Sequence, residues 1–416
     1  MLILFRVKNV LSFKEEAVLD MRAVPSYKEH LENLIDTGRK EKYLRVAAIY
    51  GANAGGKSNL WNAIACFQKI VMDSSNNVKE EDKTILSQYF IPFALEDSME
   101  GSKDSEFEIF LQIKENEYQY GFSYNDKEIK EEWLYRKGQV GKTAMIFERN
   151  GKEITFGSTV KGESAKYEKQ VPRETLVLSF FGKMIFETSS FKEPFEEIQK
   201  IGYLVSNFDS YGNQKKKLEA MLLLQIDENK RLLLDFLKAI DTGIKDIQYE
   251  NFKDWIVFNT AHEDKNGNLH WLNLSAESEG TLKSIYLFLI FNQIIRNNQV
   301  IVVDELNNKL HPLLQRLIIN MFYQEGSEAQ LIFTTHNTSL MDKRFFRRDQ
   351  IWFVQKDEYG YSELFALSDF KVRNDASFEK DYLAGVYDGI PILEDFSFEE
   401  SKKERTTEVD DGCKKK

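Results

Sequence analysis

The stretch GANAGGKS at residues 51–58 decides the fold of this chain. It matches the pattern G-x-x-x-x-G-K-[ST], a loop whose backbone N–H groups can surround phosphate oxygens. The apolar run LRVAAIY at residues 44–50 precedes it and predicts a strand, and residues 57–70 predict a helix after it. A strand, a glycine-rich loop and a helix in this order are the context that the pattern requires. We therefore predict a phosphate-binding loop here.

Each position of this loop has an expected role in binding ATP and Mg²⁺. Lys57 is expected to reach the β- and γ-phosphates, and Ser58 to ligate Mg²⁺. The helix N-terminus adds positive potential for the phosphates. The residues of this segment that we expect to touch the nucleotide are Gly51, Asn53, Ala54, Gly55, Gly56, Lys57, Ser58 and Asn59.

Two further apolar strands end in groups that suit the same chemistry. VIVVDEL at residues 300–306 delivers Asp304, expected in the shell of the magnesium ion, and Glu305, expected to take a proton from the attacking water. QLIFTTHN at residues 330–337 ends in His336, expected at the γ-phosphate or the attacking water. We predict Lys57, Glu305 and His336 as the catalytic residues, because ligands of open α/β folds bind where such strands end.

The segment LSAESEGTLKS at residues 274–284 lies before the helix that leads to the acidic strand. Ser278 and Gly280 offer a hydroxyl and backbone donors at a helix N-terminus, which is an arrangement that binds anions. Serine is also a favoured helix cap, and taken alone these residues favour an ordinary cap.

The rest of the chain predicts an α/β protein with a mixed sheet. Short alternating runs at 104–156 predict an antiparallel β meander, and apolar spacings of three and four at 190–240 predict helices. Strands and helices alternate from residue 241 onward, which indicates parallel sheet. We predict a lobe with the phosphate loop and the meander at 1–180, a helical insertion at 181–240, a second lobe at 241–372, a packing segment at 373–397 and a disordered tail at 398–416.

Composition narrows the classes of function. The chain has 416 residues, a net charge of −11, two cysteines and five histidines. This charge argues against a whole-surface grip on nucleic acid, and the basic run at 343–348 reads first as a solvated helix face. The longest apolar stretch, near 285–291, is too short to span a membrane, and no signal peptide is evident, so we expect a cytoplasmic protein without a membrane partner. Metal binding should use oxygen ligands.

Together these motifs resemble the ABC-type ATPases of the SMC and RecF kind. The resemblance rests on RVKNVLSF, GANAGGKS, ESEGT, VVDE, LNNKLHP and TTHN in this order and covers most of the chain. It implies ATP hydrolysis in a head-to-tail dimer or higher oligomer, in which Ser278 and Gly280 of one copy reach the γ-phosphate held by the other. Glu279 stands where a glycine is expected, so we expect its approach to phosphate to differ from that of the family. Gln88 is the candidate for the glutamine that links magnesium to the interface, with an exposed loop residue as its alternative.

The absence of long heptads, of transporter features and of a following nuclease pattern narrows the resemblance to stand-alone ATPases of anti-phage and abortive-infection modules, such as the RloA, AbiLi and AriA groups. This implies a nucleotide-driven switch that controls a separately encoded effector after a DNA or phage-protein trigger. In the stretch 372–393 we expect Tyr382, Leu383, Tyr387 and Ile392 to pack onto the lobe. A RecF/SMC-like ATPase in DNA repair or DNA binding, and a scaffold that binds ATP without turnover, are the alternatives.

Overall fold

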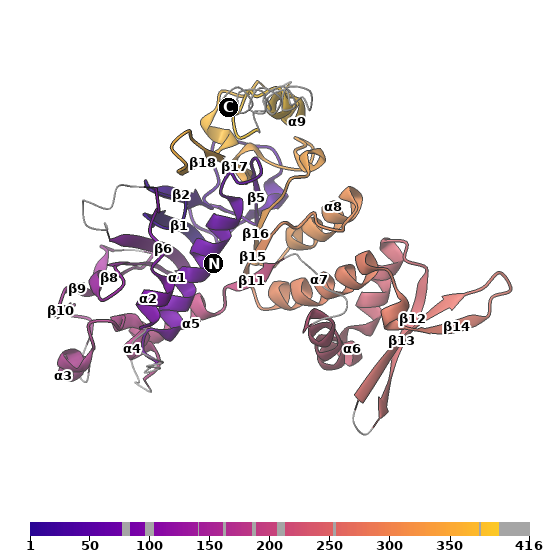
Figure 1. Ribbon diagram of the computed structural model, residues 1–416, viewed down its shortest axis with the longest axis horizontal. Helices are drawn as coiled ribbons and strands as arrows, with labels where there is room; N and C mark the ends of the chain where they lie inside the picture. The colour runs from indigo at the N-terminus through magenta and orange to yellow at the C-terminus, as the bar shows by residue number, and fades with distance from the viewer. Residues whose placement is uncertain are drawn as a thin grey trace, which may run out of the picture.

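The computed structural model describes residues 1–76, 84–95, 104–139, 141–160, 164–184, 189–205, 213–252, 255–373 and 376–390. Its centre is a six-stranded sheet, around which the other elements are arranged (Figure 1). In spatial order the strands are β11 (Gly202–Val205), β15 (Val300–Asp304), β16 (Gln330–Thr334), β5 (Val46–Tyr50), β17 (Ile351–Lys356) and β18 (Ser362–Ala366). All pairs are parallel except β17–β18, so the sheet is mixed, as expected.

The central strands are apolar on both faces because each face covers a separate core. In β5, Ala47 and Ile49 belong to one core, and Val46 and Ala48 belong to the other. The first core contains helix α1 (Lys57–Asp73), and the second contains helices α7 (Glu279–Arg296) and α8 (Pro312–Asn320). A strand buried on both faces reads as a continuous apolar run, which is why β5 could be recognised in the sequence.

A seven-stranded antiparallel sheet closes the first core. Its spatial order is β10 (Glu153–Phe156), β9 (Ala144–Asn150), β8 (Ile129–Lys137), β7 (Asn116–Tyr124), β6 (Ser105–Ile113), β1 (Leu2–Lys8) and β2 (Ala17–Asp20). Consecutive pairing from β6 to β10 confirms the expected meander. The Phe67 ring of α1 stacks on Phe122 of β7, with centroids 5.8 Å apart, so the meander packs directly on the helix that follows the phosphate loop.

The segment 181–240 is not wholly helical, which corrects our expectation. It contains α5 (Ser189–Gln199) and α6 (Asn213–Ala239), but β11 between them is an edge strand of the six-stranded sheet. The reason is that GYLV is a four-residue apolar run, too short to show a period of its own. The remaining short elements are β3 (Leu34–Ile35), β4 (Tyr43–Leu44), α2 (Ile85–Tyr89), α3 (Ser164–Tyr167) and α4 (Val177–Gly182).

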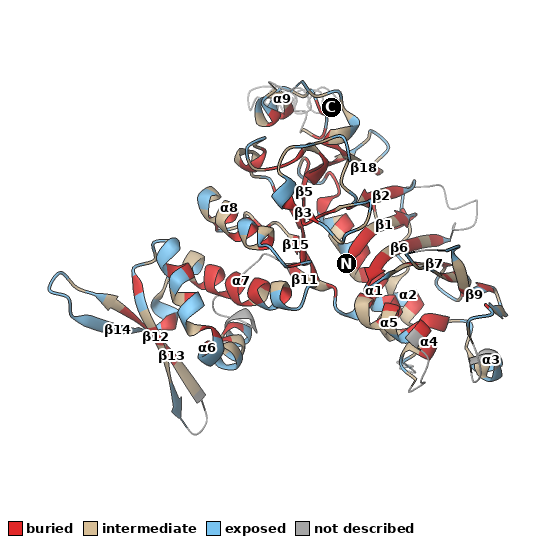
Figure 2. Ribbon diagram, turned by 180° about the vertical axis from the view of Figure 1, so that it is seen from behind, coloured by how far each residue is buried: buried red, intermediate tan, exposed pale blue. Residues whose placement is uncertain are grey.

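A third sheet follows α6 and leads to the Ser278 segment. It consists of β12 (Ile244–Phe252), β13 (Trp255–Glu263) and β14 (Leu269–Asn273), all antiparallel, and it projects from the body of the molecule beyond α6 and α7 (Figure 1). All five residues of β14 are exposed, and this edge of the molecule is largely exposed in Figure 2. The sequence predicts β12 as part of the parallel region, but it belongs to this separate antiparallel sheet.

The C-terminal packing segment is only partly as expected. Tyr382 of α9 (Phe378–Leu383) and the following Tyr387 are buried against Phe353 of β17, with ring centroids 5.3 and 6.0 Å from it. The expected packing of Leu383 is wrong, because 60% of this residue is exposed. Both Ile392 and the tail at 398–416 lie outside the described residues.

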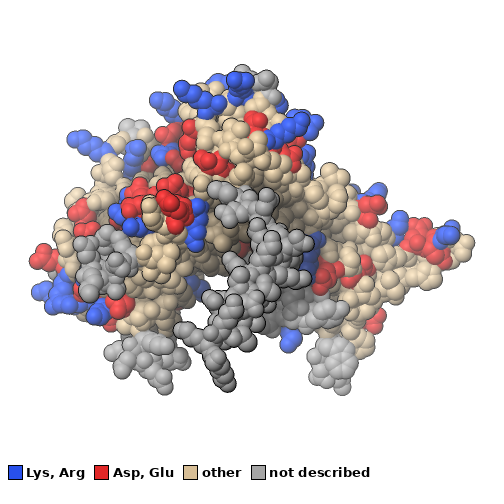
Figure 3. Space-filling model, turned by 45° about the horizontal axis from the view of Figure 1, so that its top comes forward, with Lys and Arg blue, Asp and Glu red and all other residues tan. Residues whose placement is uncertain are grey.

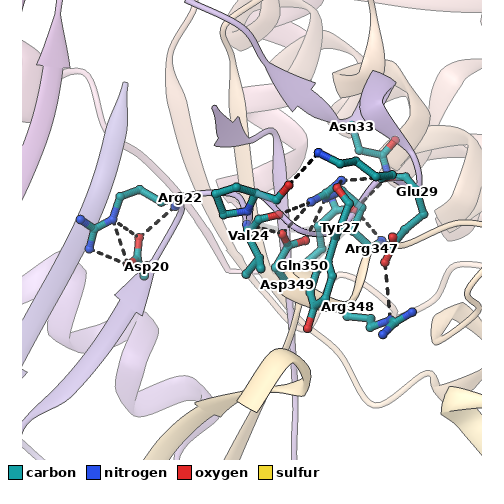
Figure 4. A network of polar contacts seen from close by, with 12 residues as sticks. Asp20, Arg22, Val24, Tyr27, Glu29, Asn33, Arg347, Arg348, Asp349 and Gln350 are labelled. Atoms are coloured by element: carbon teal, nitrogen blue, oxygen red, sulfur yellow. Dashed lines mark hydrogen bonds and ion pairs between the residues drawn. The ribbon is translucent and has the colours of Figure 1, made fainter. Parts of the chain in front are cut away.

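The basic run at 343–348 is not a continuous solvated face. Arg347 is fully buried, and its Nε and Nη2 atoms donate to the Asp349 carboxylate at 2.9 and 2.8 Å (Figure 4). Its Nη1 donates to the Glu29 carbonyl at 2.6 Å, and Arg348 lies over the Tyr27 ring. Elsewhere basic and acidic side chains are interspersed on the face in Figure 3. The run therefore contributes a buried structural ion pair.

Replacing Arg347 by methionine is expected to lower the free energy of unfolding by about 3–5 kcal/mol, because Asp349 would remain buried without its partner. Urea denaturation followed by circular dichroism measures this loss. The matched control is Arg344→Met, which removes an arginine whose side chain is 84% exposed beside Asp342 and should leave the midpoint almost unchanged. Equal midpoints for the two variants would contradict a structural role for Arg347.

Candidate active site

The phosphate loop joins β5 to α1 in a backbone shape that two glycines make possible. Gly56 has a φ of +117°, and a Cβ there would lie 2.3 Å from the Ser362 Oγ atom. A Cβ on Gly51 would lie 2.3 Å from the Val354 carbonyl oxygen. Strands β17 and β18 pack directly against the loop, so neither Gly51 nor Gly56 has room for a side chain. The loop N–H groups before α1 thus stand at a helix N-terminus, where phosphate is favoured.

Two serines from distant segments hold the loop from behind, and the sequence did not reveal them. Ser362 donates through Oγ to the Gly55 carbonyl at 2.8 Å, and the same Oγ lies 2.8 Å from the Ser12 Oγ. Asn59 donates from Nδ2 to the Ser12 Oγ at 2.7 Å, and its contact with the nucleotide stays a prediction. Asn53 and Ala54 are exposed at the loop's surface.

Lys57 is the buried cation of the site. Its Nζ donates to the carbonyl oxygens of Gly51 and Ala52, both at 2.8 Å, so the ammonium group lies over the loop. Burial lowers the pKa of Lys57 to about 8, while the nearby Asp304 and Glu305 carboxylates oppose this shift. Lys57 is therefore mostly charged at neutral pH, and it has little solvation to lose when an anion arrives.

Ser58 and Asp304 form a pair of oxygen ligands between α1 and β15. The Ser58 Oγ donates to the Asp304 Oδ2 atom at 2.8 Å, and the Thr334 hydroxyl donates to the other oxygen, Oδ1, at 2.6 Å. A hydroxyl and a carboxylate fit Mg²⁺, which takes few protein ligands and completes its octahedron with phosphate oxygens and water. The described residues contain no group of three or more His, Cys, Asp or Glu that could hold a metal ion.

Glu305 and His336 face each other at the ends of neighbouring strands. The His336 Nε2 lies 4.0 Å from the Glu305 Oε1, and both side chains are partly exposed. Glu305 has a φ of +52°, and its N–H donates to the Thr334 Oγ1 at 2.7 Å. Burial, and then the charge of Lys57, lower the pKa of His336 below its ordinary value. The lowered pKa favours the neutral imidazole. The Thr334 hydroxyl joins the Asp304 carboxylate to the backbone N–H of Glu305.

Within its own chain, Ser278 is hydrogen-bonded to the first turn of α7 rather than to the residues at the strand ends. It is exposed and caps α7, accepting a hydrogen bond from the Thr281 N–H at 3.1 Å. Within one copy it is therefore a helix cap, and its contact with a second copy stays a prediction. A Cβ on Gly280 would lie 3.3 Å from the Lys309 carbonyl oxygen, so α7 begins against the loop that follows Glu305.

The loop after Glu305 is also tied to α7 by charged side chains. Lys309 pairs with Glu279 at 2.7 Å, and the buried Lys283 donates to the Asn308 carbonyl. Glu279, which stands where the resembled family has glycine, thus has a partner of its own in this chain. Gln88 lies exposed on α2, and among the described residues the structure brings it into no hydrogen bond with Ser58 or Asp304.

Solved structures similar to the chain include the SMC head domain from Thermotoga maritima, with 13% identity, a TM-score of 0.42 and coverage of 88% of this chain and 98% of that chain. An Smc head bound to the C-winged helix domain of ScpA has 14% identity, a TM-score of 0.42 and coverage of 92% and 99%. No curated protein matches the chain.

Within the described residues, no helix is both long enough and apolar enough to cross a membrane.

The matching family model covers a longer part of the chain than any single motif does. It begins at β5, the strand directly before the phosphate loop, and ends after His336. The model of the family described as "AAA domain, putative AbiEii toxin, Type IV TA system" matches residues 46–342, well over half of the chain, and the chain belongs to that family.

Proposed function

We propose that the chain binds ATP with Mg²⁺ at residues 51–58 and hydrolyses it. The contact between the Ser58 Oγ and the Asp304 Oδ2 carries this proposal. It joins the helix after the phosphate loop to the acidic strand through the two ligands that a phosphate-bound Mg²⁺ needs. Bound Mg²⁺ would neutralise charge on the β- and γ-phosphates, and Lys57 lies where its ammonium group can neutralise part of the same charge.

Hydrolysis assigns a separate task to each group at the strand ends. A water molecule attacks the γ-phosphorus, the bond from that phosphorus to the bridging β–γ oxygen breaks, and Glu305 accepts the water's proton. His336, whose lowered pKa favours the neutral imidazole, donates to or accepts from the γ-phosphate or the water. The products are ADP and phosphate, with Lys57 beside the charge that develops on the leaving oxygen.

The complete site requires a second copy in this proposal. Ser278 is exposed at the N-terminus of α7, so its hydroxyl and the first N–H groups of the helix are accessible to a partner's γ-phosphate. Two chains arranged head to tail would place each Ser278 and Gly280 over the other's phosphate loop. ATP then favours the closed pair because it contacts both copies.

We further propose that this closure is a switch in bacterial anti-phage defence that controls a separately encoded effector. The toxin–antitoxin wording of the family description supports such a two-component setting. Either DNA or a phage protein would act as the trigger. The change in shape between open and closed pairs is the signal that the effector would read.

The first experiment is ATP turnover and assembly state of the full chain, measured with Mg²⁺, with and without DNA, at two salt concentrations. We expect turnover and an ATP-dependent increase in mass, with little effect of DNA, because the run at 343–348 is partly consumed in a buried ion pair. Strong, salt-sensitive stimulation by DNA would instead favour the DNA-repair alternative. Tight ATP binding without turnover would indicate the scaffold alternative and would contradict an enzyme.

A further inference from the structure

Glu277 stands immediately before Ser278, and its carboxylate is held by the projecting sheet. The Glu277 Oε1 accepts a hydrogen bond from the Thr260 Oγ1 at 2.5 Å and another from the His262 Nε2 at 2.7 Å. Both donors lie on β13, two residues apart, so they share one face of the sheet. The Glu277 side chain is only 9% exposed, although Ser278 beside it is exposed.

The backbone of this segment is fixed on both sides of Glu277. Leu274 is buried in the second core, and its carbonyl accepts the Glu277 N–H at 3.1 Å. Ser278 already satisfies the cap of α7 through the Thr281 N–H. Glu277 is therefore not needed as a cap. Its hydrogen bonds instead join the segment to β13.

We propose that Glu277 is a positioning residue that sets the Ser278 hydroxyl for the nucleotide bound by a partner chain. This proposal rests on the proposed function. A carboxylate oxygen suits the place because it can accept from two donors at once. The pairing of Lys309 with Glu279 restrains the same helix start from the other side. Ser278 is thus held between the projecting sheet and the loop that follows Glu305.

The test compares two histidines on the same sheet. His262→Ala removes a donor to Glu277, whereas His270→Ala removes the histidine directly opposite on β14, which pairs with Asp264 instead. We expect His262→Ala and Glu277→Ala each to lower kcat about tenfold or more, since small misplacements of a catalytic group are costly. The Kd for a fluorescent ATP analogue should stay near the wild-type value, and His270→Ala should retain wild-type turnover. Equal kcat for the two histidine variants would overturn the proposal.

Mixing variants separates positioning from a local structural role. Lys57→Ala disables a chain's own phosphate loop but leaves its Ser278 segment intact. In a head-to-tail pair with Glu277→Ala, one site therefore combines an intact phosphate loop with an intact Ser278 segment, and turnover should rise above that of either variant alone. The reference mixture is Ser278→Ala with Lys57→Ala, and tagged pull-down verifies that mixed pairs form.

The outcomes distinguish this inference from the proposal on which it rests. Recovery in both mixtures supports positioning by Glu277 across the pair. Recovery only in the Ser278 mixture would show that Glu277 acts within its own chain and would overturn the inference, while the shared site would stand. No recovery in either mixture of verified pairs would remove the shared site, and with it the role of Glu277.

Discussion

Glu305→Gln is expected to lower ATP turnover by about 10²–10⁴-fold, the range that a general base contributes. Glutamine keeps the size and shape of the side chain but cannot take the proton of the attacking water. Because binding of ATP does not depend on that proton transfer, the closed pair should accumulate. Turnover assays and light scattering in the presence of ATP and Mg²⁺ measure the two effects on one preparation.

The control for this variant is Glu325→Gln, which makes the same chemical change at an exposed glutamate outside the site. It should keep full turnover and the wild-type dependence of mass on ATP. Unchanged turnover in Glu305→Gln would remove Glu305 as the base. Lost turnover without a trapped pair would retain the base but contradict closure by ATP.

Lys57→Met is expected to weaken ATP binding by about a hundredfold. The ammonium group is placed to donate charged hydrogen bonds to phosphate, and each such bond contributes about 1.5–3 kcal/mol. A loss of about 3 kcal/mol of binding free energy corresponds to about a hundredfold increase in Kd. Methionine fills a similar volume without the charge. Titration with a fluorescent ATP analogue measures Kd, and circular dichroism checks that the fold is retained.

The same titration repeated across pH tests the charge itself. Burial lowers the pKa of Lys57 to about 8, so the free protein loses this charge as the pH rises through that value. ATP favours the charged form, and the affinity should therefore fall between pH 7 and 9. Lys57→Met has no group to titrate there and should show a flat profile. A steep profile in the variant would assign the titration to another group.

The sequence predicted the part of the site that follows from strand order. Strands β15, β16 and β5 are adjacent and parallel, so their carboxyl ends meet at one edge. Asp304 is the last residue of β15, His336 comes shortly after β16, and the phosphate loop follows β5. Motifs at the ends of apolar runs are therefore enough to predict that these groups lie together.

The supporting residues could not be predicted in this way. Ser12, Thr334 and Ser362 are ordinary residue types whose roles arise only when segments distant in sequence meet. Thr334 lies within the TTHN motif, but its hydroxyl was not distinguished from that of the next threonine. Alternation along strand β16 would have separated the two, since neighbouring side chains point to opposite faces.

Errors in the fold arose where a pattern was short. Strand β11 has four residues, and its place in the sheet is set by pairing with β15 rather than by a periodicity of its own. Leu383 ends a short helix, α9, whose buried face is carried by Phe378 and Tyr382 instead. The role expected for Gln88 stays a prediction, and the structure places this residue, exposed, on helix α2.

The left-handed backbone at Glu305 sets stability against chemistry at a single position. A residue with a side chain in this region costs about 1–3 kcal/mol, which glycine would largely avoid. A glycine at 305 would therefore relax the loop and also delete the carboxylate. Glu305 is thus conformationally strained, whereas glycine, the residue best suited to this backbone, has no carboxylate to accept a proton. Selection for a more stable fold would thus tend to lower the proposed ATP turnover, and engineering for heat resistance should leave this loop unchanged.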